Sequence, residues 1–80
     1  MFVSVEISYY PLVEKFEEPI HRFIQKINDE NIGIETGSMS TVITGEYTII
    51  MNLLTETMDE LMQQYPSVFT LKISNSCRVL

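Results

Sequence analysis

Polar and apolar residues alternate over the first ten positions of the chain. The odd-numbered positions are apolar, and they are Val3, Val5, Ile7 and Tyr9. The even-numbered positions are mostly polar, and they are Ser4, Glu6, Ser8 and Tyr10. A period of two with β-branched residues predicts a strand over 2–9 that has one apolar face. Because proline cannot donate a ladder hydrogen bond, the strand is expected to end at Pro11.

The apolar spacing then changes to three and four residues, which is the period of a helix. Two segments show it: Phe16, Ile20, Phe23, Ile24 and Ile27 in the first, and Tyr47, Ile50, Met51, Leu54, Met58, Leu61, Met62 and Tyr65 in the second. Because proline is tolerated only in a first turn, Pro19 places the start of the first helix near Glu17 or Glu18. This helix is expected to run to about Asn31, and Pro66 is expected to end the second.

Two further stretches have the composition of strands. The segment between the helices is interpreted as two short strands, about 34–38 and 40–44, joined by a tight or kinked hairpin at Gly37. After Pro66, apolar and polar residues alternate again over 68–75. The order strand, helix, strand, strand, helix, strand predicts an α+β, ferredoxin-like fold, in which both helices cover one face of a four-stranded antiparallel sheet.

The other face of the predicted sheet is open and semi-polar. It carries Ser4, Glu6, Ser8, Tyr10, Thr70, Lys72 and Ser74. A chain of 80 residues, 45% of them hydrophobic, is expected to form one domain over 1–80 with a small core. We therefore expect a homo-oligomer, a dimer or a tetramer, that associates through this open face.

The charge pattern excludes nucleic acid as the expected partner. The net charge is −6, and the basic residues are scattered rather than clustered: Lys15, Arg22, Lys26, Lys72 and Arg78. No stretch of apolar residues approaches the ~20 that a membrane span requires. The first ten residues lack the basic region of a signal peptide, and Cys77 is the only cysteine. These features indicate a cytoplasmic protein.

The sequence offers no recognisable catalytic or metal site. His21 is the only histidine and Cys77 the only cysteine, so no two such residues have the spacing of metal ligands. The first loop lacks the arginine that acyl-phosphate hydrolysis needs, and it lacks the cysteine pair of a metal chaperone. We therefore expect a protein that is not an enzyme and uses neither metal nor cofactor.

The segment ETGSMSTVITG at 35–45 is the most distinctive stretch of the chain. It holds three threonines, two serines and two glycines around one methionine. Hydroxyls are hydrogen-bond donors and acceptors, and glycine permits close approach, so one interpretation is a neutral, polar binding strip. The other is a kinked hairpin whose Thr and Ser simply favour strands and turns. The strip consists of Thr36, Gly37, Ser38, Met39, Ser40 and Thr41.

Glu6 is the second candidate for a binding role, because it lies mid-strand on the open face between two serines. It is either an exposed strand carboxylate or an anchor for a cationic or amidine-like heterocycle. The second interpretation rests on the ability of a carboxylate to accept two parallel N–H bonds. Gly37 is expected to adopt a backbone conformation that a β-carbon would strain.

Three segments of the chain resemble the YkoF-type family of thiamine-binding domains: VSVEISYYPL at 3–12, TGSMSTVITG at 36–45 and LKISNS at 71–76. The resemblance covers nearly the whole chain. It implies a ferredoxin-like fold whose sheets pair into α-β-β-α sandwiches. It also implies binding of thiamine or its hydroxymethylpyrimidine portion without catalysis. The family commonly has glutamine at the position of Glu6 and proline at the position of Ser38.

This resemblance suggests a small-molecule-binding protein in thiamine salvage, transport support or sensing. Under this hypothesis Met39 packs on a ring face, Glu6 pairs with the aminopyrimidine edge, and the hairpin supplies hydroxyls. Ser8 and Tyr10, beside Glu6 on the open face, complete the candidate ligand-binding set. The alternative is a structural homo-oligomeric association domain that uses the open face and binds no small molecule.

Overall fold

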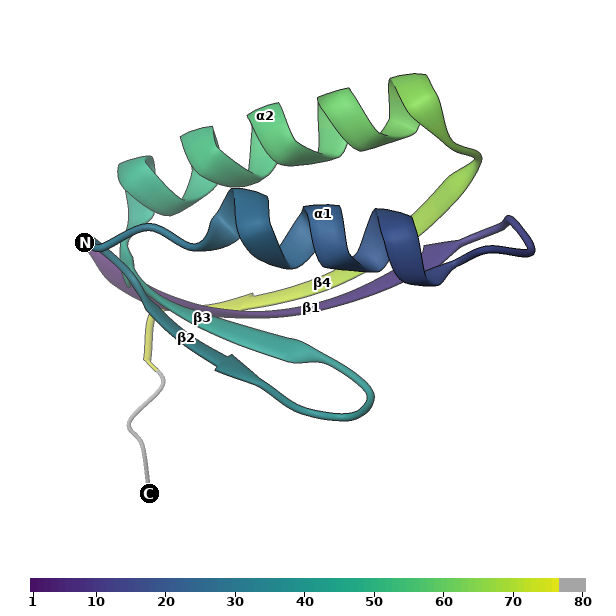
Figure 1. The fold of residues 1–80 in the computed structure, drawn as a ribbon. Helices are drawn as coiled ribbons and strands as arrows, with labels where there is room; N and C mark the ends of the chain where they lie inside the picture. The colour runs from purple at the N-terminus through teal and green to yellow at the C-terminus, as the bar shows by residue number, and fades with distance from the viewer. Residues whose placement is uncertain (77–80) are drawn as a thin grey trace.

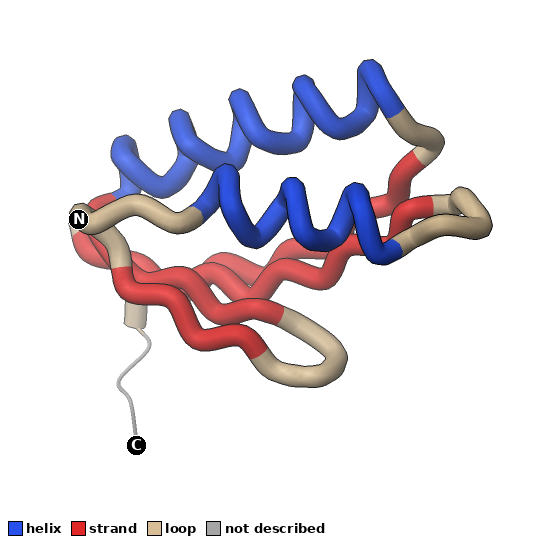
Figure 2. The backbone as a smooth tube through the Cα atoms, viewed as in Figure 1, coloured by secondary structure: helices blue, strands red, loops and turns tan. Residues whose placement is uncertain are grey.

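Two helices cover one face of a four-stranded antiparallel sheet in the computed structural model, which describes residues 1–76 (Figures 1 and 2). The elements are β1 (Phe2–Pro11), α1 (Glu17–Ile27), β2 (Gly33–Thr36), β3 (Thr41–Glu46), α2 (Tyr47–Gln64) and β4 (Ser67–Ser74). The sequence prediction of an α+β, ferredoxin-like fold is confirmed. Cys77 lies outside the described residues. Within those residues, neither helix is long and apolar enough to cross a membrane.

Several element boundaries differ from the sequence prediction. β1 continues to Pro11, which is tolerated there because at that end β1 pairs only with β4. α1 ends at Ile27 instead of about Asn31, since the Asn31 backbone N–H donates to Asp29 Oδ1 at 2.7 Å and forms a turn in place of helix. The loop between the hairpin strands is longer than expected, because β2 ends at Thr36 and β3 begins at Thr41, and β3 continues to Glu46 instead of ending near residue 44.

The strands lie in the order β2-β3-β1-β4, and all three pairings are antiparallel. Ile7 of β1 pairs with Thr41 of β3 and Leu71 of β4, and these residues face the helices. The adjacent residue Glu6 pairs with Val42 and Lys72, and therefore faces the opposite side. Each row of side chains across the sheet thus belongs wholly to the covered face or wholly to the open face.

The core lies between the helices and the covered face of the sheet. The buried apolar residues come from β1, β3 and both helices: Val3, Val5, Ile7, Phe23, Ile27, Ile43, Ile50, Leu54 and Leu61. An aromatic cluster continues this core towards the far end of β1. There the Tyr9 ring stacks on Phe69 with centroids 4.3 Å apart, and it lies tilted against Phe23 at 5.5 Å.

Glu46 sets the start of α2, and the sequence pattern gave no indication of this. Its carboxylate oxygen Oε1 accepts hydrogen bonds from the backbone N–H groups of Thr48 at 2.8 Å and Ile49 at 3.2 Å. The bonds from Ile49 and Thr48 hold the pKa of the Glu46 carboxyl below its usual value. Because these donors have no partner within the helix, the cap lets α2 follow β3 without a linker.

Candidate functional site

A cavity of about 140 Å³ lies on the covered face of the sheet, between α1 and the hairpin loop 37–40 that joins β2 to β3. Three parts of the chain line it. β1 contributes Ile7 and Tyr9, and α1 contributes Ile20, Phe23 and Ile24. The hairpin contributes Thr36, Gly37, Ser38, Met39, Ser40 and Thr41, which are the six residues of the polar strip predicted from the sequence.

The β1 side of the cavity is aromatic and fixed in orientation. The Tyr9 ring is held from one side by stacking on Phe69 with an interplanar angle of 5°. Its hydroxyl lies 3.0 Å from Ser67 Oγ, whose own hydroxyl donates to the Tyr65 carbonyl at 2.9 Å. The ring is therefore anchored at both its face and its tip, and it offers a rigid surface to a planar ligand.

The hairpin side of the cavity is polar and compact. The Gly37 N–H donates to the Ser40 carbonyl at 2.8 Å, and this bond closes the loop between Thr36 and Thr41. Thr41 is only 4% exposed, and it pairs with Ile7 on the covered face of the sheet. Met39 is 85% exposed at the tip of the loop. A mainly apolar cavity with a few polar groups on one side is the usual composition of a small-molecule site.

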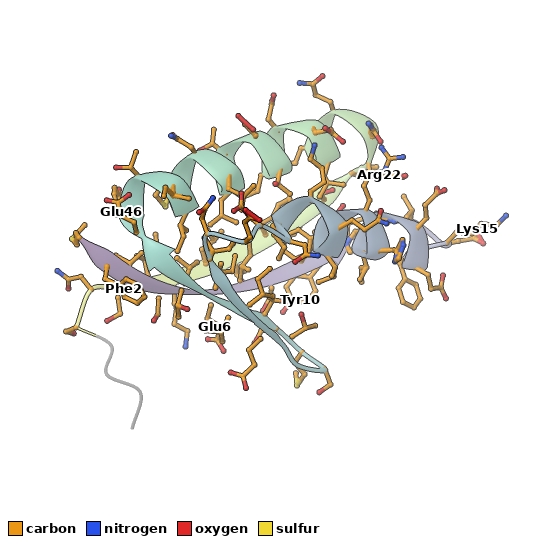
Figure 3. All side chains as sticks on the ribbon, turned by 60° about the vertical axis from the view of Figure 1, so that its left-hand side comes forward. Phe2, Glu6, Tyr10, Lys15, Arg22 and Glu46 are labelled. Atoms are coloured by element: carbon orange, nitrogen blue, oxygen red, sulfur yellow. The ribbon has the colours of Figure 1, made fainter. Side chains whose placement is uncertain are left out.

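The remaining sequence candidates lie on the opposite face of the sheet. Figure 3 shows Glu6 on the side away from α2, and it does not line the cavity. Glu6 still reaches the hairpin, because Ser40 Oγ donates to its Oε2 at 3.1 Å, and its Oε1 lies 3.5 Å from Lys72 Nζ. Ser8 Oγ likewise donates to the Met39 carbonyl at 3.3 Å.

Tyr10 does not line the cavity, although it lies two residues beyond Ser8 on the same face of β1. It pairs with Val68 at the far end of β1, on the open face, and its side chain is exposed. The nine candidates thus separate into three sets. Six surround the cavity, Glu6 and Ser8 hold the loop from the open face, and Tyr10 stands apart.

The expectation for Gly37 is wrong. No residue in the part of the chain that the structure describes, Gly37 included, has a positive φ. A β-carbon on Gly37 would lie 3.4 Å from the Ser40 carbonyl oxygen, an ordinary contact distance. The loop closes through the Gly37–Ser40 hydrogen bond, and this closure requires no conformation reserved for glycine.

Sequence reasoning missed the wall that α1 contributes. Ile20, Phe23 and Ile24 were assigned to a helical stripe that packs in the core, because three- and four-residue spacing marks that stripe. Of these, Phe23 is buried, whereas Ile20 is 36% exposed at the cavity. No signal in the sequence separates an apolar residue that fills the core from one that lines a cavity.

The polar contacts of Glu18, Lys26 and Tyr65 on the helices involve no residue that lines the cavity. Tyr65 donates to Glu18 Oε1 at 3.2 Å, and burial together with that carboxylate raises the pKa of the Tyr65 hydroxyl. Lys26 Nζ pairs with Glu60 Oε1 at 2.6 Å and joins α1 to α2. Within residues 1–76, no three His, Cys, Asp or Glu side chains are grouped so that they could hold a metal ion.

Residues 5–76 match the model of the thiamine-binding protein family. Among solved structures, the chain is 32% identical to a protein from Thermotoga maritima provisionally assigned to thiamine biosynthesis or salvage. The TM-score is 0.83, and the match covers 95% of this chain and 85% of that one. No curated protein matches the chain.

Two other solved structures share the fold at lower identity. A protein from Streptococcus pneumoniae is 22% identical with a TM-score of 0.84, over 99% of this chain and 90% of that one. A hypothetical protein from Methanocaldococcus jannaschii is 23% identical with a TM-score of 0.82, over 95% and 81%.

Proposed function

The chain belongs to the family of thiamine-binding proteins, and we propose that it binds thiamine or its hydroxymethylpyrimidine portion without catalysing a reaction. The observation that carries this proposal is the cavity between α1 and the hairpin. Six residues singled out from the sequence surround it, from Thr36 to Thr41. Its aromatic and apolar side suits a ring face, and its hydroxyl-bearing side suits a ring edge that donates and accepts hydrogen bonds.

The volume of the cavity favours the binding of a single ring over the enclosure of a whole thiamine molecule. Drug-sized ligands occupy pockets of roughly 300–1,000 Å³, whereas a dry cavity of about 150 Å³ accommodates benzene. At about 140 Å³, the cavity matches the pyrimidine ring. The ring would lie against Tyr9, with Thr36 and Thr41 near its polar edge. The thiazolium part of thiamine would then lie at the mouth, beside the exposed Met39 and Ile20.

We place this binding activity in the cytoplasm, in thiamine salvage, transport support or sensing. The support for a reducing compartment is the single cysteine of the sequence. The net charge of −6 favours association with a cationic ligand such as thiamine over an anionic one.

Isothermal titration calorimetry with thiamine, with hydroxymethylpyrimidine and with the isolated thiazole portion tests the proposal. The melting temperature of each mixture is measured in parallel, so that binding with little heat is still detected. We expect thiamine and hydroxymethylpyrimidine to bind and the thiazole portion to bind much more weakly. If none of the three gives heat or raises the melting temperature, the alternative of an association domain without a ligand replaces this proposal.

We further propose that the chain forms at least a dimer through the open face of the sheet. Phe2, Tyr10 and Val68 lie exposed on that face, which neither α1 nor α2 covers. A specific interface buries roughly 1,200–2,000 Å² in total, and a single sheet face of this fold is large enough to supply its share. Light scattering is expected to give a mass of at least twice the 9.3 kDa of one chain at micromolar concentration.

Substitution of Tyr10 by aspartate is expected to lower that mass towards the monomer, because it places a charge within the interface. Phe16 is a matched control, since both aromatic side chains are 49% exposed but Phe16 precedes α1, away from the open face. Phe16→Asp should leave the mass unchanged. A wild-type protein that scatters as a monomer would refute the assembly.

A further inference from the structure

We propose that Glu6 is a positioning residue that fixes one wall of the cavity from the opposite face of the sheet. It accepts the hydroxyl proton of Ser40 and so holds the hairpin loop 37–40 in place. The inference rests on the proposed function in one respect, which is that the cavity is a ligand site. It replaces direct contact between Glu6 and a ligand in this cavity, because Glu6 lines only hollows on the open face of the sheet.

The hairpin loop is anchored on both faces of the sheet. Thr41, where β3 begins, pairs with Ile7 and is buried on the covered face. The preceding residue Ser40 lines the cavity, but its hydroxyl turns to the open face and donates to Glu6 Oε2 at 3.1 Å. A displacement of Ser40 therefore has two effects at once: it breaks the hydrogen bond to Glu6, and it changes the shape of the cavity.

A second contact from β1 reinforces the first. Ser8 Oγ donates to the Met39 carbonyl at 3.3 Å, one residue before Ser40. Glu6 and Ser8 lie two residues apart on β1, so both project from the same face of a central strand. The loop is thus attached to β1, whereas its own tip at Met39 is exposed.

The two carboxylate oxygens of Glu6 have different partners. Oε2 accepts from Ser40, and Oε1 lies 3.5 Å from Lys72 Nζ on β4. In the single chain the Lys72 side chain is 86% exposed, so the ion pair contributes little there by itself. A hydrogen bond to an ionised carboxylate is stronger than one between neutral groups, and the Ser40 contact therefore positions the loop. Lys72→Ala removes the ion pair and leaves this contact intact.

The test measures two quantities in each variant. One is the affinity for hydroxymethylpyrimidine by calorimetry. The other is the hydrogen-exchange rate of the Gly37 amide, which donates to the Ser40 carbonyl at 2.8 Å and reports loop closure without ligand. Glu6→Ala and Ser40→Ala are each expected to weaken binding and accelerate exchange by roughly threefold to tenfold. The double variant should be no worse than either single one, because both remove the same contact.

Two further variants separate positioning from a general structural effect. Glu6→Gln keeps an oxygen that accepts the Ser40 proton and is expected to retain most of the affinity and the slow exchange. Lys72→Ala should leave both quantities at their wild-type values, and light scattering checks that it leaves the proposed assembly through the open face unchanged. The proposal is overturned if Glu6→Ala matches the wild type in both measurements. It is also overturned if Glu6→Ala weakens binding while Ser40→Ala does not, because Glu6 would then contact the ligand directly.

The two proposals fail separately. If the wild-type protein does not bind hydroxymethylpyrimidine, the proposed function is refuted. The exchange rate of the Gly37 amide in Glu6→Ala still decides whether Glu6 holds the loop.

Discussion

Replacing Ile20 with tryptophan is expected to weaken hydroxymethylpyrimidine binding about thirtyfold. Ile20 lies on α1 at the mouth of the cavity and is 36% exposed, so a larger side chain fits there without disturbing the core. An indole at this position occupies or covers the space that the ligand ring requires. Excluding a ring that buries about 80 Å² of apolar surface forfeits roughly 2 kcal/mol, at about 25 cal/mol per Å².

The matched control for this variant is Ile49→Trp. Ile49 lies on α2 and is 41% exposed, but it does not line the cavity. Calorimetry should give the control the wild-type affinity, and both variants should melt close to the wild-type temperature. Wild-type affinity in Ile20→Trp would mean that the ligand binds somewhere other than between α1 and the hairpin.

Substitution of Gly45 by valine is expected to lower the free energy of unfolding by about 2–3 kcal/mol, a fall of roughly 10–20 °C in melting temperature. Gly45 is buried on β3 opposite Val3. A β-carbon there would lie 3.1 Å from Ile32 Cγ2 and 3.4 Å from Ile50 Cδ1. Valine adds two further methyl groups to this packed site. The total stability of an 80-residue domain is about 4–12 kcal/mol, so the loss is large.

Gly37→Val is the control for the steric crowding expected in Gly45→Val. Gly37 has no positive φ, and its added β-carbon meets only the Ser40 carbonyl oxygen within contact distance. We expect its free energy of unfolding to change by less than about 1 kcal/mol. Urea denaturation curves measure both variants. Equal midpoints for Gly45→Val and the wild type would show that β3 has room for a side chain at that position.

The order of the elements followed from local periodicity alone. Alternation in β1 and β4 and the helical stripes in α1 and α2 are each readable within a short window, and few topologies join such elements. The alternation also separated Glu6 and Ser8 from Ile7 and Tyr9. That separation is why the open face could be predicted residue by residue.

The candidate site was only partly predictable, because it depends on contacts between distant segments. The composition of 36–41 marked the hairpin side of the cavity, but the side of the sheet on which it lies depends on the pairing of Thr41 with Ile7. That register cannot be read from the hairpin sequence. Glu6 was therefore grouped with the hairpin as a ligand contact, whereas in the structure it reaches the hairpin through Ser40.

The aromatic side of the cavity illustrates the same limit. Tyr9 reads as one more apolar position of β1, and Phe23 as one more position of the α1 stripe. Only the tertiary arrangement leaves a cavity between them and the hairpin. The stacking of Tyr9 on Phe69 joins residues from the two ends of the chain, and no local pattern encodes it.

A crystal structure of the protein with hydroxymethylpyrimidine tests the central claim most directly. We expect density for one planar ring between α1 and the hairpin loop, against Tyr9 and beside Thr36 and Thr41, with the Ser40–Glu6 hydrogen bond retained. Density for the ring on the open face of the sheet, in direct contact with Glu6, would contradict the account. So would an unoccupied cavity at ligand concentrations that saturate binding in solution.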